Sequence, residues 1–255
     1  MTTPTNGSGA ATTAATPDND NDDDRLSQRL WHDALPLAYF SLHHPFVHGI
    51  AAGTLPRAQW LDYVAQDAHY LRHFSSAYAH AMDKLDARAQ LAESGVSGGG
   101  PEQAQRLRDA RARVGRLLSS VLDELRLHGG YAARWGVPKE TLERGASRET
   151  EAYTGFLHSV AADPRSPPGD VLAAMAPCLR LYAWLGCSLK SGNEAARRAL
   201  GGEENNPNPY GEWVETYSGE EYKAMVEVGE RLLDEAAALG GGDGGDAERD
   251  FGELF

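Results

Sequence analysis

Apolar residues recur at steps of three and four along most of this chain, which is the spacing of one face of an α-helix. No stretch of useful length alternates between apolar and polar residues, as a half-buried strand would. We therefore predict an all-α fold, a single domain of roughly seven to nine helices over residues 24–255. Residues 1–23 lack apolar periodicity and are predicted to form a disordered acidic tail.

The predicted helices are joined by segments rich in glycine, proline and polar residues. Thr54 is expected to cap the first long helix, and 85–101 to form a surface loop. We expect Gly129 to stop the next long helix, and Ser218 with Glu221 to form a capping box. The predicted helices cover about 26–38, 46–52, 54–84, 103–128, 149–161, 169–190, 210–217 and 218–239.

The helix over 169–190 carries a thiol on its apolar face. Cys178 and Tyr182 continue the stripe that Val171 and Met175 begin, and Pro177 is expected to bend or open the helix beside the thiol. A free cysteine in such a place is usually a small core residue. The alternative is a nucleophile that the helix presents to a pocket.

A second polar residue lies on an apolar face. Asp67 follows Val64 by three residues and precedes Leu71 by four, so it shares their side of the helix over 54–84. A buried carboxylate is costly unless it is paired or hydrogen-bonded. Asp67 therefore either completes a polar network in the core or binds a polar ligand in a cavity.

Composition and net charge argue against several classes of protein. The 255 residues carry a net charge of −13, which argues against nucleic acid and anionic membranes as partners. The two cysteines, Cys178 and Cys187, point to opposite sides of one helix, so no disulfide is expected. We find no signal peptide and no apolar run of membrane-spanning length, and we expect a cytoplasmic protein, with an organelle as the alternative.

Several motifs together resemble the TenA family, known as thiaminase II or aminopyrimidine aminohydrolase. The resemblance runs from about Leu26 to the end of the chain and is nearest to the TenA-like domain of plant thiamin-monophosphate phosphatases. Those proteins continue into a phosphatase domain, for which this sequence has no motif. The matching motifs are His44-Pro45-Phe46, Gly53-Thr54-Leu55, Gln66-Asp67-Ala68-His69-Tyr70-Leu71, Tyr153-Thr154-Gly155-Phe156-Leu157, Pro177-Cys178-Leu179-Arg180-Leu181-Tyr182 and the segment 210–217.

The resemblance implies a haem-oxygenase-like fold, a homo-oligomer (tetramer or dimer) and a small pyrimidine substrate, without cofactor or metal. It assigns Cys178 as the nucleophile that adds to the ring and Asp67 as the partner of the ring's amino and nitrogen edge. Tyrosines would line the pocket by stacking and by hydroxyl hydrogen bonds. These are Tyr70, Tyr153, Tyr182 and Tyr217.

One element of the family pattern is missing. The resemblance places a catalytic glutamate on a last helix, whereas this sequence reaches Phe255 where that helix would begin, and Glu253 comes too early. We therefore expect a truncated last helix without that glutamate.

Two other functions are compatible with the residues. A module that binds a thiamin precursor without turnover would also lack the glutamate. A di-iron oxygenase on the same fold would use carboxylates and histidines spaced by four, as are Glu124 with His128 and His69 with His73.

Overall fold

The computed structural model describes residues 25–95, 99–200 and 208–235, which form helices joined by turns and contain no strand. The all-α prediction is therefore confirmed for this part of the chain. The helices are α1 (Leu26–Leu42), α2 (Pro45–Ala52), α3 (Arg57–Ser94), α4 (Pro101–Trp135), α5 (Lys139–Leu142), α6 (Arg148–Ala162), α7 (Pro168–Leu200), α8 (Gly211–Ser218) and α9 (Glu220–Asp234).

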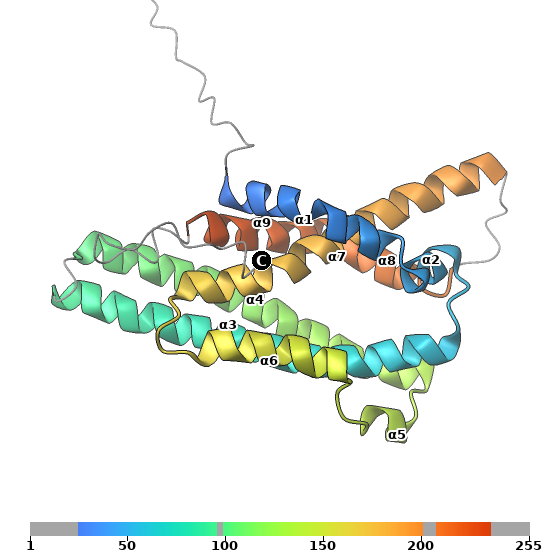
Figure 1. Ribbon diagram of the computed structural model, residues 1–255, viewed down its shortest axis with the longest axis horizontal. Coiled ribbons are helices and arrows are strands. Elements are labelled where there is room, and N and C mark those ends of the chain that lie inside the picture. Colours follow the sequence, from blue (N-terminus) through green and yellow to red (C-terminus); the bar gives the residue numbers. More distant parts are fainter. Residues whose placement is uncertain (1–24, 96–98, 201–207, 236–255) are drawn as a thin grey trace, which may run out of the picture.

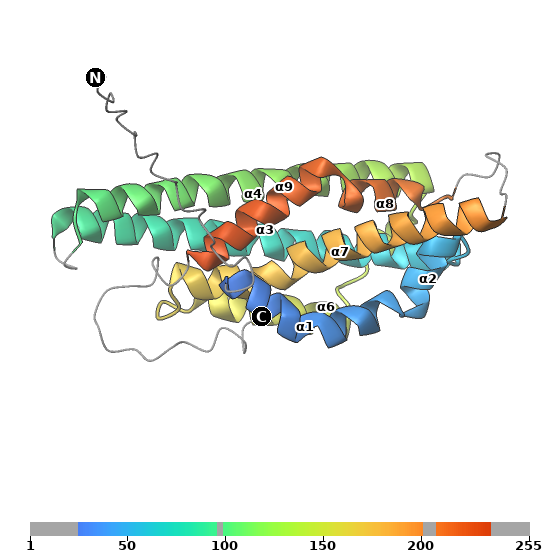
Figure 2. The ribbon, with the colours of Figure 1, turned by 90° about the horizontal axis from the view of Figure 1, so that it is seen from above.

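Two long helices, α3 and α4, run antiparallel along the length of an elongated bundle (Figures 1 and 2). Small alanines at three- and four-residue steps let the two backbones approach closely, among them Ala81 and Ala110, which are fully buried. The helices α6, α7 and α9 complete the main core, and α2 and α8 close a second, aromatic-rich core at one end. Asp67 lies on α3 where the two cores meet.

The helix that carries Cys178 is an internal element of the bundle. α7 packs against α3, α6, α8 and α9 and continues as a helix through Pro177, so it does not open there, and a bend at Pro177 stays a prediction. Its segment Pro168–Gly192 has 25 residues and is long and apolar enough to cross a membrane by length and composition, against our sequence-based expectation. Burial of this segment among the other helices explains its apolar composition.

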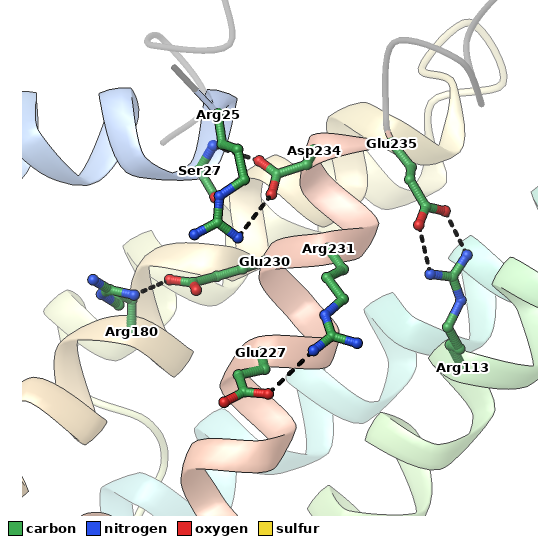
Figure 3. Close-up of polar contacts among 9 residues, drawn as sticks. All are labelled: Arg25, Ser27, Arg113, Arg180, Glu227, Glu230, Arg231, Asp234 and Glu235. Carbon is green, nitrogen blue, oxygen red and sulfur yellow. Dashed lines mark hydrogen bonds and ion pairs between the residues drawn. The ribbon is translucent and has the colours of Figure 1, made fainter. Parts of the chain in front are cut away.

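Salt bridges tie α9 to three neighbouring parts of the bundle (Figure 3). Asp234, the last residue of α9, accepts a 2.8 Å hydrogen bond from the backbone N–H of Ser27 at the start of α1. Such pairs add little free energy where they are exposed, but they fix how α9 lies across α4 and α7. The three pairs are Arg25–Asp234, Arg180–Glu230 and Arg113–Glu235.

Helix ends differ from the prediction more than helix positions do. Pro56, not Thr54, occupies the N-cap position of α3, which continues ten residues past Lys84 to Ser94. α4 passes through Gly129 and ends at Gly136, whose left-handed φ of 58° suits glycine. The Ser218 hydroxyl makes no capping bond, because the backbone there turns directly from α8 into α9. The tail 1–23 and the expected truncated helix near Phe255 lie outside the described residues.

Candidate active site

Side chains from five helices line a pocket whose non-atom space, open solvent included, is about 470 Å³. α3 and α4 form one side, α7 the opposite side, and α8 and α9 close the end. The walls are aromatic and aliphatic, with two carboxyl groups and one thiol among them. The lining residues are Asp67, Tyr70, Leu71, Phe74, Tyr78, Leu117, Ser120, Val121, Glu124, Cys178, Leu179, Tyr182, Tyr217, Tyr222 and Met225.

Cys178 presents its thiol to this pocket. Its Sγ lies 3.0 Å from the hydroxyl oxygen of Tyr153 on α6. Burial raises the pKa of the Cys178 thiol, and hydrogen bonds with the Tyr153 and Tyr70 hydroxyls act in the opposite direction. The net rise keeps the group a neutral thiol near pH 7, so a reaction at sulfur needs an acceptor for its proton.

Tyr153 is placed differently from the other predicted tyrosines. It is absent from the pocket lining and lies behind Cys178, stacked on Tyr70 with ring centroids 5.9 Å apart. Its hydroxyl reaches the thiol rather than the pocket. Tyr70, Tyr182 and Tyr217 do line the pocket, as do Cys178 and Asp67, so the structure brings five of the six predicted site residues to one cavity.

Asp67 is 6% exposed and lies 3.0 Å from Nε2 of His128, measured from its Oδ2. Burial, with the nearby charge of Glu124, raises the pKa of Asp67 well above its usual range. Burial lowers the pKa of His128 to about 4. Both shifts favour the uncharged forms, so the contact is one between neutral groups. Oδ2 of Asp67 has no hydrogen-bond partner among the described residues, which leaves it open to a polar ligand.

Glu124 is a pocket residue that the sequence pointed to only as a potential metal ligand. Its Oε1 accepts a 2.6 Å hydrogen bond from the Tyr217 hydroxyl. Burial raises its pKa, and the bond from Tyr217 lowers it. A signal was present in the sequence, because Glu124 follows the buried Val121 by three residues and precedes the buried His128 by four.

The tyrosines at the closed end of the pocket are held by a close approach of two helices. A Cβ on Gly186 of α7 would lie 2.7 Å from the backbone carbonyl carbon of Tyr217 on α8. Only a glycine lets α8 lie so near, and this places the Tyr217 ring 4.9 Å from the rings of both Tyr182 and Tyr222. The pocket thus depends on a residue that has no side chain.

Tyr78 lies on the α3 side of the pocket. Its side chain is 1% exposed, and its hydroxyl has no hydrogen-bond partner among the described residues. An unsatisfied buried hydroxyl is costly, so a ligand atom that accepts its hydrogen bond would be favoured.

The described residues include one group of potential metal ligands in this region. One ligand atom from each of Asp67, Glu124 and His128 lies within 4.8 Å of the others. His69 is not in this group, because its Nε2 contacts the carbonyl of Arg144, and His73 is exposed. The ligand set that a di-iron centre would draw from both histidine pairs is not assembled in this part of the chain.

Comparisons with known proteins identify relatives of this chain. The chain is 29% identical over 210 residues to the aminopyrimidine aminohydrolase of Halalkalibacterium halodurans, covering 82% of this chain and 80% of that protein. It is 27% identical over 228 residues to the mitochondrial bifunctional TH2 protein of Arabidopsis thaliana, covering 83% of this chain but 32% of that protein. The chain therefore spans about a third of the length of the plant relative.

Solved structures resemble the fold. A protein described as a TenA family transcription regulator from Silicibacter superposes with a TM-score of 0.64 at 26% identity, covering 89% of this chain and 86% of that one. A TenA homologue from Pyrococcus furiosus gives a TM-score of 0.65 at 15% identity, covering 89% of each chain, which supports the fold alone. The model of the TENA/THI-4/PQQC family matches residues 31–240, and the chain belongs to that family.

Proposed function

We propose that this protein is a hydrolase that releases ammonia from 4-amino-5-aminomethyl-2-methylpyrimidine, with Cys178 as its nucleophile. The observation that carries the proposal is the position of the thiol. Cys178 is held 3.0 Å from the Tyr153 hydroxyl and lines an aromatic pocket together with Asp67. Relatives named aminopyrimidine aminohydrolase support the same reaction class.

Asp67 is suited to the edge of an aminopyrimidine. That edge offers one N–H donor on the amino group and one acceptor on the adjacent ring nitrogen. A protonated carboxyl offers the complementary pair, an O–H donor and a carbonyl acceptor. The raised pKa of Asp67 supplies this protonated form. The tyrosine rings would contact the faces of the ligand, and the Tyr78 hydroxyl would donate to a polar atom of the ligand.

The chemistry can proceed from a neutral thiol. The S–H group of Cys178 adds across a C=N bond of the ring, with sulfur bonding to carbon and the proton moving to nitrogen. The electron pair of the ring's amino group then expels the leaving nitrogen, which departs with the electrons of its C–N bond. Water adds to the exocyclic methylene, and loss of the thiol restores the aromatic ring. The net reaction converts the amine and water into the hydroxymethylpyrimidine and ammonia. Thiamin, whose leaving group is a thiazole, would follow the same steps.

Cys178→Ser tests the nucleophile. A serine hydroxyl is a far weaker nucleophile, so we expect ammonia release from the aminomethyl-pyrimidine to fall at least about a thousandfold while pyrimidine affinity changes little. The measurements are an ammonia assay and calorimetric binding. Cys187→Ser on the same helix is the matched control, because Cys187 is a free thiol outside the pocket lining.

Two results would contradict this assignment. A Cys178→Ser variant that hydrolyses as fast as the parent would remove Cys178 from the mechanism. A parent protein that binds the pyrimidine without releasing ammonia would favour the alternative of a non-catalytic binding module.

A further inference from the structure

The polar groups of the pocket carry charge of one sign only. Among the described residues that line it, two are carboxylic acids, Asp67 and Glu124, and none is lysine, arginine or histidine. The histidine behind Asp67 adds no compensating charge at neutral pH, because burial lowers the pKa of His128 to about 4. A ligand group that reaches this end of the pocket therefore meets an acidic site without a countercharge.

The two carboxyl groups divide into one acid and one carboxylate. Two carboxylates in a buried site repel each other, so ionisation of one keeps the proton on the other. Burial raises the pKa of both groups. The charge of Glu124 raises that of Asp67 further, whereas the hydrogen bond that Tyr217 donates to Glu124 opposes the rise at Glu124 and favours its ionised form. Asp67 thus keeps the proton that suits the ring edge, and Glu124 is left as the anion.

Three aromatic rings lie beside this anion. Tyr217 donates to Glu124 at 2.6 Å, and its ring is 4.9 Å from those of Tyr182 and Tyr222. All three rings line the pocket. Tyrosine faces attract cations, and a desolvated carboxylate attracts them more strongly. A carboxylate beside three tyrosine rings is a binding arrangement for a small organic cation.

We propose that Glu124 is the counter-ion for a positively charged substituent on the pyrimidine, so that the site selects ligands whose leaving group is cationic. The class includes an aminomethyl group, which is an ammonium in water, and a thiazolium. Neutral hydroxymethyl pyrimidines bind more weakly, because they leave the buried carboxylate without a countercharge. Anionic phosphorylated pyrimidines bind more weakly because the carboxylate repels them. This inference rests on the proposed pyrimidine site but not on turnover.

The test compares two nearly isosteric ligands, 4-amino-5-aminomethyl-2-methylpyrimidine and its 5-hydroxymethyl analogue. Their dissociation constants are measured by calorimetry with the full chain carrying Cys178→Ser, which prevents turnover, with and without Glu124→Gln. Glutamine keeps the size of the side chain and an oxygen that can accept the Tyr217 bond, but it has no charge. Glu212→Gln, an exposed carboxylate of α8 that pairs with Arg134, is the matched control.

We expect the protein with Glu124 to bind the aminomethyl ligand about 10- to 100-fold more tightly than the hydroxymethyl ligand. Glu124→Gln should bring this ratio near one, while affinity for the hydroxymethyl ligand stays within about threefold. Glu212→Gln should leave the ratio as it was. Tyr217→Phe, which frees the carboxylate but keeps the ring, should lower the ratio only in part, and thermal melting checks that each variant is folded.

A ratio that Glu124→Gln leaves unchanged would overturn the proposal, as would equal affinities in the protein with Glu124. Failure of both ligands to bind would overturn the pyrimidine site as well. Charge-dependent binding in a protein that releases no ammonia would instead refute the proposed hydrolase and leave Glu124 in its assigned role.

Discussion

Asp67 illustrates how the protonation state of one residue decides what it recognises. Its carboxyl is buried at the meeting point of two apolar cores, and its pKa is raised well above the usual range. A carboxylate could only accept hydrogen bonds, whereas the protonated group both donates and accepts. The amide of asparagine has the same pattern of one donor and one acceptor.

We therefore expect Asp67→Asn to keep pyrimidine affinity within about fivefold, whereas Asp67→Leu weakens it by about 100-fold by leaving the ring edge without partners. Calorimetry with the hydroxymethyl ligand measures both variants, and this neutral ligand separates the effect from that of Glu124. An Asp67→Asn variant as weak as Asp67→Leu would mean that the ligand requires the carboxylate.

Single residues were partly predictable from the sequence. Cys178 and Asp67 lie on apolar stripes, and helical spacing made both candidates for either core residues or chemistry. Glu124 lies on a stripe in the same way, but its partner Tyr217 is 93 residues away in the chain. Helical spacing indicates which residues share one face of a helix, but it does not indicate which other helix packs against that face.

At the scale of elements, the contact between α7 and α8 is set by glycine. Gly186→Ala would place a Cβ 2.7 Å from the backbone carbonyl carbon of Tyr217, so α8 has to move away from α7. We expect a loss of about 1–3 kcal/mol in the free energy of unfolding and weaker pyrimidine binding, because Tyr217 and its partner Glu124 shift. Denaturant unfolding and calorimetry measure the two effects.

The matched control is Gly130→Ala in the interior of α4. A Cβ there meets no atom of the described residues within 4 Å, so alanine should raise the free energy of unfolding by about 1 kcal/mol through helix propensity alone. If Gly186→Ala were equally stabilising, the close approach of α7 and α8 would not determine the site.

Helix positions followed from periodicity, whereas several helix ends did not. Gly129 and Gly130 cost α4 only about 1 kcal/mol each, and contact with α3 along the whole helix outweighs this. The long pairing of α3 and α4 extends both helices beyond the ends that local signals predicted. Tertiary packing overrides a weak local signal because its contributions add along the interface.

At the scale of the whole molecule, the buried histidine makes stability depend on pH. Because the folded pKa of His128 is lowered to about 4, its contribution is fully present above the unfolded value near 6.5 and is lost as the pH falls through about 4. Asp67 acts in the opposite direction, since its raised pKa gives stability that is lost as the pH rises. Comparing the parent with a His128 variant separates the contribution of His128 from that of Asp67.

We expect the stability difference between the parent and His128→Gln to fall by on the order of 3 kcal/mol between pH 7 and pH 4. Glutamine does not titrate, so the variant lacks this component of the acid response. Urea unfolding at several pH values measures it. A difference that is constant across this range would show that folding does not shift the pKa of His128.

The exposed surface bears on the expected homo-oligomer. Leu37 and Phe40 of α1 are 73% and 75% exposed, one helical turn apart, which is compatible with association between copies of the chain. The oligomeric state stays a prediction.

The sequence by itself determined the helical class, the position of most helices, and the thiol and carboxyl that lie on apolar faces. These properties follow from spacing along one chain, since the period of a helix needs no partner. Only the tertiary structure decided that Tyr153 serves the thiol, that Glu124 meets Tyr217, and that Gly186 brings α8 against α7. These contacts depend on the angles and distances at which separate helices pack. Many residues far apart in the chain jointly determine that packing.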